Sequence, residues 1–212
     1  MTHDPNQLLK DLGRHQLVDG YPLLVDLDRS HGSWIHDRIH DCEFLDAFTC
    51  FASWPIGYNH PGFLEPEMLE TFKRASLSKV SNSDLYCEDL CRFVDTFAQH
   101  ATPDGFPHHF WVSGGALAVE NAMKTAFDWK ARKLGRTNFD DPVEDLLILH
   151  FREAFHGRSG YTMSVTNTLP DKVGLYPKFD WPRVHNPTVH YDLDGNISNE
   201  VAAEETRACG EI

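Results

Sequence analysis

The sequence of 212 residues contains no long apolar run. The longest stretch without a charged residue, residues 47–64, is interrupted by Pro55, His60 and Pro61, which is not typical of a membrane-spanning helix. Residues 1–10 have neither the apolar centre nor the cleavage site of a secretory signal. These absences predict a cytoplasmic protein that does not insert into a membrane.

Cysteine is scarce and unpatterned, with five residues and no Cys-x-x-Cys pair. This pattern favours a reducing compartment over a disulfide-bonded secreted fold. His36 and His40 have a spacing that would suit zinc on a helix, but their neighbours predict strand and turn, which would separate the two rings. We therefore expect no metal site.

Basic residues are in the minority. The chain has 19 Lys and Arg against 32 Asp and Glu, which gives a formal charge of −13 with histidine neutral. Binding to phosphate backbones or to anionic membrane surfaces needs clustered basic side chains. The composition therefore excludes nucleic acid and membranes as expected partners.

Hydrophobic residues make up 41% of the chain, enough for a sizeable core. Apolar periodicity predicts helices over residues 65–75, 84–100, 116–134 and from 201, with Ser83 as a helix N-cap and Gly135 as a terminator. Alternating or buried runs predict strands over residues 21–27, 33–37, 43–48, 108–112, 146–151 and 189–193. This order indicates an α/β fold with a largely parallel sheet and a boundary between residues 62 and 63.

The segment of residues 111–116, Trp-Val-Ser-Gly-Gly-Ala, is a predicted strand that ends in two glycines and opens a long helix. Free backbone N–H groups at such a helix start bind anions, and glycines let a phosphate approach closely. No Walker loop and no GxGxxG fingerprint is present. From geometry alone, either a phosphate site or a simple tight turn fits this segment.

The segment of residues 153–160, Glu-Ala-Phe-His-Gly-Arg-Ser-Gly, follows a predicted buried strand. Ligands of α/β sheets bind beyond the carboxyl ends of the strands. Phe155 could stack on a planar ring, and Arg158 could hold a carboxylate in a bidentate fork. The alternative is a surface loop with a structural ion pair.

Taken together and in this order, these segments resemble the class III, fold type I aminotransferases that depend on pyridoxal 5′-phosphate (PLP). The resemblance extends from about residue 21 to the end of the chain. Its further motifs are residues 51–53, 59–61, 81–84, 92–97, 127–130 and the run Gly-Gly-Ala-Leu-Ala-Val-Glu-Asn-Ala at residues 114–122. Most of the class has a Ser-Gly-Thr-Glu-Ala type of phosphate turn, and the variant found here is the one expected of members that act on lysine.

The resemblance implies a site residue by residue. Backbone N–H groups of Gly115 and Ala116 would hold the cofactor phosphate. Phe155 would stack on the pyridine ring with His156 beside it, and Arg158 would bind the α-carboxylate of L-lysine or of 2-oxoglutarate. The implied reaction moves the ε-amino group of L-lysine to 2-oxoglutarate, giving 2-aminoadipate 6-semialdehyde and glutamate. Ornithine, acetylornithine or 4-aminobutyrate would be the donor if another member of the class were the better match.

The resemblance also implies that residues 1–62 form the N-terminal segment of the small domain and residues 63–212 the first part of the large PLP-binding domain. None of the eight lysines has the sequence context of the family's Schiff-base lysine, so no catalytic lysine is assigned. We expect the chain to be the N-terminal part of an enzyme that works as a homodimer when complete. A non-catalytic module that keeps half the fold is the alternative.

Overall fold

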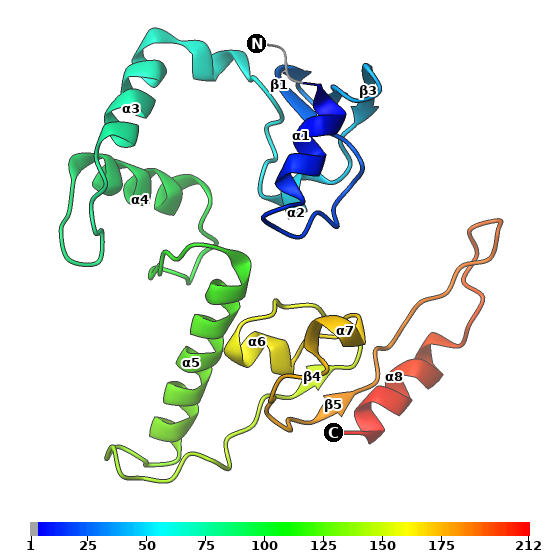
Figure 1. Ribbon diagram of the computed structural model, residues 1–212. Helices are drawn as coiled ribbons and strands as arrows, with labels where there is room; N and C mark the ends of the chain where they lie inside the picture. Colours follow the sequence, from blue (N-terminus) through cyan, green and yellow to red (C-terminus); the bar gives the residue numbers. More distant parts are fainter. Residues whose placement is uncertain (1–3) are drawn as a thin grey trace. The chain divides into compact units, whose positions relative to one another are not determined.

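The computed structural model describes residues 4–212 (Figure 1). The chain forms two compact units, Met1–Thr102 and Pro103–Ile212, which are described separately. The division predicted after residue 62 concerns the domains of a complete enzyme and stays a prediction. No helix in the described part of the chain is long and apolar enough to cross a membrane.

The first unit opens with helix α1 (Pro5–Leu12), followed by a three-stranded antiparallel sheet. The Asp4 carboxylate accepts the Asn6 N–H at 3.0 Å and so caps the start of α1. The strands are β1 (Val25–His31), β2 (Trp34–Asp37) and β3 (Cys42–Leu45), in the order β1-β2-β3. This β-meander confirms the three strands predicted in this region.

Strand β1 lies further along the chain than the prediction of residues 21–27, because residues 28–31 are strand and not turn. The pairing of β1 with β2 is irregular between Asp26 and His31. The buried Ser30 hydroxyl spans this irregularity, donating to the Asp26 carbonyl at 2.6 Å and accepting the His36 N–H at 3.0 Å. A bulge bridged by the Ser30 side chain therefore continues the strand through residues 28–31, whose residue types are typical of a turn.

Asp37, at the end of β2, is a fully buried carboxylate. It accepts the N–H groups of Leu24 at 2.9 Å, Ile39 at 3.0 Å and His40 at 3.2 Å, and it pairs with the His40 ring. Burial by itself raises the pKa of Asp37, but the hydrogen bonds from Ile39, Leu24 and His40 outweigh it and lower the pKa to about 2. The charged carboxylate therefore holds together the chain before and after β2.

We predict that Asp37→Asn reduces stability near neutral pH and weakens the acid dependence of unfolding. The pKa of about 2 in the folded protein lies below the ordinary aspartate value of 3.8, so the stabilisation is present above pH 4 and is lost between about pH 4 and 2. Its size is at most about 2 kcal/mol. Urea unfolding at a series of pH values measures it. The control Asp28→Asn changes an exposed carboxylate on β1 and should leave the profile unchanged.

Residues Thr49–Ala52 (α2) form one turn of left-handed helix, with φ values of 48°, 49°, 60° and 61° and no glycine among them. Left-handed backbone costs an ordinary L-residue roughly 1–2 kcal/mol. The Asp46 carboxylate offsets part of this cost by accepting the Phe48 and Thr49 N–H groups at 2.9 and 2.8 Å. No helix or strand is predicted for this segment from its residue pattern.

We predict that Ala52→Gly stabilises the protein by about 0.5–1 kcal/mol, because glycine adopts positive φ without a Cβ penalty. The exposed Ala75 in helix α3 (Pro66–Leu77) provides the control. Ala75→Gly should destabilise by a similar amount, because right-handed helix favours alanine. Urea midpoints of the two variants should move in opposite directions, and a loss of stability in both would contradict the left-handed turn.

The rest of the first unit comprises the 3₁₀ helix η1 (Pro61–Leu64), α3 and α4 (Glu88–His100). Helix α4 begins four residues later than the prediction, and its N-cap residue is Cys87 and not Ser83. Ser81 and Ser83 instead donate to the Asp84 carboxylate at 2.7 and 2.8 Å, which folds the preceding segment into a turn. Arg74 grips Asp89 through two hydrogen bonds of 3.1 and 2.7 Å and so links α3 to α4.

The second unit is built around α5 (Gly115–Lys133), the longest helix described. Its bounds confirm the predicted helix of residues 116–134, and Gly135 follows it with φ of 77°, as expected of a terminator. Three short helices complete the unit: α6 (Gly160–Ser164), α7 (Pro170–Val173) and α8 (Val201–Gly210). Buried Met123 of α5 packs with Val165 and Trp181 to form the core cluster, flanked by Val119, Phe127, Ile148 and Tyr161.

The sheet of this unit is a parallel pair, β4 (His150–Phe151) and β5 (Arg183–Val184), as the α/β prediction requires. The strand predicted over residues 146–151 keeps only its last two residues, and residues 108–112 are not a strand. Residues 189–193 are not a strand either: Tyr191 forms only an isolated antiparallel bridge with Ile197, across a turn at residues 193–195. The Asp192 carboxylate accepts the N–H groups of Asp194 and Asn196 at 2.9 and 2.8 Å and so closes this turn.

Candidate functional site

The start of α5 is an open helix N-terminus. The N-cap residue is Gly114, with φ of 95° and no side-chain hydrogen bond at the cap. A Cβ built on Gly114 or on Gly115 would have no atom within 4 Å. The first-turn N–H groups therefore have no side-chain cap, and there is open space beside both glycines at the positive end of a 19-residue helix. This geometry suits an anion such as a phosphate.

The loop before α6 carries the other candidate side chains, and all three are exposed. The Phe155 ring is 63% exposed and contacts no other ring among residues 4–212. Neither His156 nor Arg158 has a side-chain hydrogen bond or an ion pair within the described chain. Of the described arginines, only Arg38 shares this isolation with Arg158. An aromatic face, an imidazole and a guanidinium are therefore free to meet a ligand.

These two segments are brought into contact, although they lie about forty residues apart in the sequence. Gly157 has φ of 123°, and a Cβ at this position would lie 2.4 Å from the Ala116 Cβ. On the next turn of α5, the Glu120 carboxylate accepts the Tyr161 N–H at 3.0 Å. Figure 1 shows α6 beside the first half of α5. The two contacts fix the loop against the open helix start.

Glu120 has a different role from the one its position suggests. At the sequence level it serves to complement the helix dipole near the start of α5. In the structure its carboxylate binds the first turn of α6, across 41 residues of sequence. Two further contributors were not singled out from the sequence, Thr162 and Thr166, whose hydroxyls bond the loop backbone and are buried.

We predict that Gly157→Ala strongly destabilises the second unit, because it combines a left-handed backbone with a clash against Ala116. Gly135→Ala is the matched control, since Gly135 also has positive φ, of 77°, but no atom near a built Cβ. The control should cost about 1 kcal/mol, and Gly157→Ala should cost about 1–3 kcal/mol more. Urea unfolding measures both, and equal losses would show that the close contact is absent.

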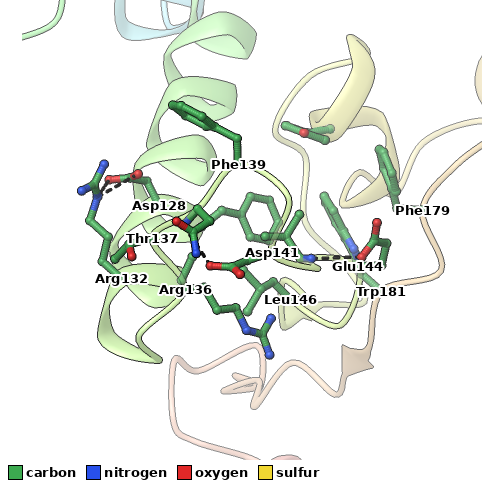
Figure 2. Close-up of a pocket in the computed structure, with 15 residues that line it drawn as sticks. Asp128, Arg132, Arg136, Thr137, Phe139, Asp141, Glu144, Leu146, Phe179 and Trp181 are labelled. Carbon is green, nitrogen blue, oxygen red and sulfur yellow. Dashed lines mark hydrogen bonds and ion pairs between the residues drawn. The ribbon is translucent and has the colours of Figure 1, made fainter.

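A cavity of about 480 Å³ lies elsewhere in the second unit (Figure 2). Its lining comes from the last turns of α5, the following loop and the aromatic side chains Tyr161, Phe179 and Trp181. Ala131, on its α5 side, is about 24 Å along the helix from Gly115. No predicted site residue lines the cavity. Its two arginines already bind carboxylates, Arg132 with Asp128 at 2.9 Å and Arg136 with Asp145 at 2.5 Å.

The histidines considered for metal binding serve the first unit's sheet. The His40 ring pairs with Asp37, and the His36 ring lies 3.2 Å from the Asp41 carboxylate. Within residues 4–212, no group of three or more His, Cys, Asp or Glu side chains is arranged to hold a metal ion. The five cysteines are free thiols.

The chain has relatives among known aminotransferases. The sequence profile described as aminotransferase class-III matches residues 17–210. The L-lysine-epsilon aminotransferase of Amycolatopsis lactamdurans is 47% identical over 202 residues, covering 95% of this chain and 44% of the relative. The 4-aminobutyrate aminotransferase of Mycosarcoma maydis is 30% identical over 213 residues, covering 94% of this chain and 42% of that relative.

A solved structure matches along the whole chain. The lysine aminotransferase of Mycobacterium tuberculosis superposes with a TM-score of 0.83 at 42% identity, covering 99% of this chain and 47% of that one. The fold is therefore that of an α/β transferase of fold type I, a group whose members use PLP. More narrowly, the chain belongs to the class-III aminotransferase family. It spans slightly less than half the length of the relatives that it matches.

Proposed function

We propose that the protein containing this chain transfers the ε-amino group of L-lysine to 2-oxoglutarate with PLP as cofactor. The products are 2-aminoadipate 6-semialdehyde and glutamate. The observation that carries the proposal is the contact of Gly157 with Ala116, which places an aromatic ring and an unpaired arginine beside an open helix N-terminus. The choice of lysine rests on the 47% identity to an L-lysine-epsilon aminotransferase.

The residues present fit the cofactor. The N–H groups of Gly115 and Ala116 bind its phosphate, and this contact is made by backbone because alanine has no hydroxyl. The exposed Phe155 ring stacks on the pyridine ring, with His156 beside it. When bound, PLP supplies the electron sink for the reaction, while the protein orients it.

Arg158 binds the carboxylate of both substrates in turn. Its guanidinium has no competing carboxylate among the described residues, so no internal ion pair must be broken when a substrate binds. A planar fork matched to a carboxylate also orients the substrate, which a point charge would do less well. The same arginine therefore serves L-lysine and 2-oxoglutarate.

We assign no catalytic lysine to residues 1–212, because none of the eight lysines has the family's sequence context. We further propose a cytoplasmic homodimer as the working form. The second candidate donor is 4-aminobutyrate, favoured by the 30% identity to an enzyme of that name over 94% of this chain.

The complete open reading frame that contains the chain tests the proposal. Purified protein should bind PLP and form glutamate from 2-oxoglutarate when L-lysine is added. A panel of L-lysine, ornithine, acetylornithine and 4-aminobutyrate identifies the donor. Protein that binds no PLP would overturn the proposed function, and activity on another donor without activity on lysine would overturn the substrate.

We predict that Arg158→Ala raises the KM for both L-lysine and 2-oxoglutarate by at least about 30-fold, because it removes one partner of a charge pair that is desolvated when the substrate binds. Arg158→Lys should lie between this variant and the wild type, because it keeps the charge but loses the fork. The control is Arg38→Ala, which removes the other isolated arginine from the first unit. Steady-state kinetics with each substrate varied separately measures the effect. An unchanged KM in Arg158→Ala would remove Arg158 from the site.

A further inference from the structure

At its centre, the loop that carries the proposed cofactor and substrate contacts is held by one buried hydroxyl. The Thr166 side chain accepts the His156 N–H at 2.9 Å and donates to the Gly157 carbonyl at 2.7 Å. Thr166 is 3% exposed and lies just beyond the end of α6. One oxygen atom thus holds two backbone groups that belong to neighbouring residues.

We propose that Thr166 is a positioning residue for this site, acting through its hydroxyl on the backbone of His156 and Gly157. The inference rests on the proposed function, since Thr166 would position the loop from which Phe155 and Arg158 contact the cofactor and the substrates. Those two side chains lie immediately on either side of the pinned pair. Any shift of the pair moves the ring-stacking group and the carboxylate-binding group together.

The hydroxyl is suited to this task because it accepts one hydrogen bond and donates another at the same time. Valine has the same shape but can do neither, whereas serine can do both. Without the hydroxyl, an N–H and a C=O of the loop lose their partner next to a tightly packed contact. Only threonine and serine, of the residues that fit this space, therefore keep the loop in place.

Neighbouring contacts confine the pinned pair but do not replace Thr166. On one side, the Asn167 N–H donates to the Ala154 carbonyl at 2.6 Å. On the other, the Thr162 hydroxyl accepts the Ser159 N–H at 3.2 Å as part of the capping box of α6. Between these fixed ends, the Thr166 hydroxyl holds the backbone of His156 and Gly157, and Gly157 is the residue that approaches Ala116.

Two variants of Thr166 and one matched control test the inference in the complete protein. Thr166→Val should raise the Kd for PLP and the KM for both substrates by about tenfold. Thr166→Ser should stay within about threefold of the wild type, because it restores both hydrogen bonds. The control Ser164→Ala removes another buried hydroxyl of α6, which accepts the Phe179 N–H at 2.9 Å and does not touch the loop. Its Kd and KM should stay within about twofold, at a comparable fall in Tm.

Three results would overturn the inference. The first is that Thr166→Val and Ser164→Ala have the same Kd and KM values at equal Tm, which would make Thr166 a stabilising residue only. The second is that Thr166→Ser raises Kd and KM as much as Thr166→Val does, which would mean that loss of the hydroxyl is not the cause of the effect. The third concerns the wild type, in which the hydrogen bond to Thr166 should protect the His156 amide hydrogen from exchange. Exchange as fast as that of a loop amide without a hydrogen bond would contradict this.

The hydrogen-exchange measurement remains decisive if Thr166→Val does not fold. It also separates failure of this inference from failure of the proposed function. If the protein has neither bound PLP nor transaminase activity but its His156 amide is protected, the role of Thr166 in holding the loop stands and the proposed function is wrong. If the wild-type protein is active but its His156 amide is unprotected, the proposed function stands and the role of Thr166 is wrong.

Discussion

The close approach of Gly157 to Ala116 is the constraint on which the candidate site depends. It brings two backbones closer than any side chain at position 157 would allow. Burial of Met123, Val165 and Trp181 draws α5 and α6 together, but a hydrophobic cluster sets no register between them. The hydrogen bond from the Tyr161 N–H to Glu120 supplies that register, because it is directional and spans the same two helices. Packing therefore provides the attraction, and one glycine and one carboxylate set its geometry.

The elements that could be predicted from the sequence are those whose cause is local. The helix at residues 115–133 is predicted by its own apolar stripe, its basic last turn and the glycine after it. Strands depend on a partner. Residues 108–112 have a strand-like composition, but a ladder needs a second strand beside them, and the only pair of named strands in the second unit is His150–Phe151 with Arg183–Val184. The bulge at Ser30 and the left-handed turn at residues 49–52 likewise depend on contacts that no local pattern shows.

The candidate site divides in the same way. Phe155, His156 and Arg158 could be found from the sequence because their side chains carry the chemistry that a ligand needs. Thr162 and Thr166 could not, because a hydroxyl among Met163, Ser164 and Val165 is as typical of a half-exposed strand as of a buried anchor. Their exposed fractions of 0% and 3% show that these hydroxyls serve the backbone, not the solvent. The residues that place a site are chemically less conspicuous than the residues that form it.

Electrostatics explains why the anion-binding groups must be local. A chain with a formal charge of −13 repels an anion, such as the proposed substrate 2-oxoglutarate, at long range. Most arginines are already neutralised by neighbouring carboxylates, for example Arg74 by Asp89 and Arg132 by Asp128. Attraction for an anion therefore has to come from groups that have no internal partner. In the second unit, two such groups lie at the candidate site, the open start of α5 and Arg158, and the contact of Gly157 with Ala116 keeps their segments side by side. The net negative charge thus attracts a cationic amino donor, such as the proposed L-lysine, at long range. The loop supplies the positive charge of Arg158, which an anionic acceptor meets at close range.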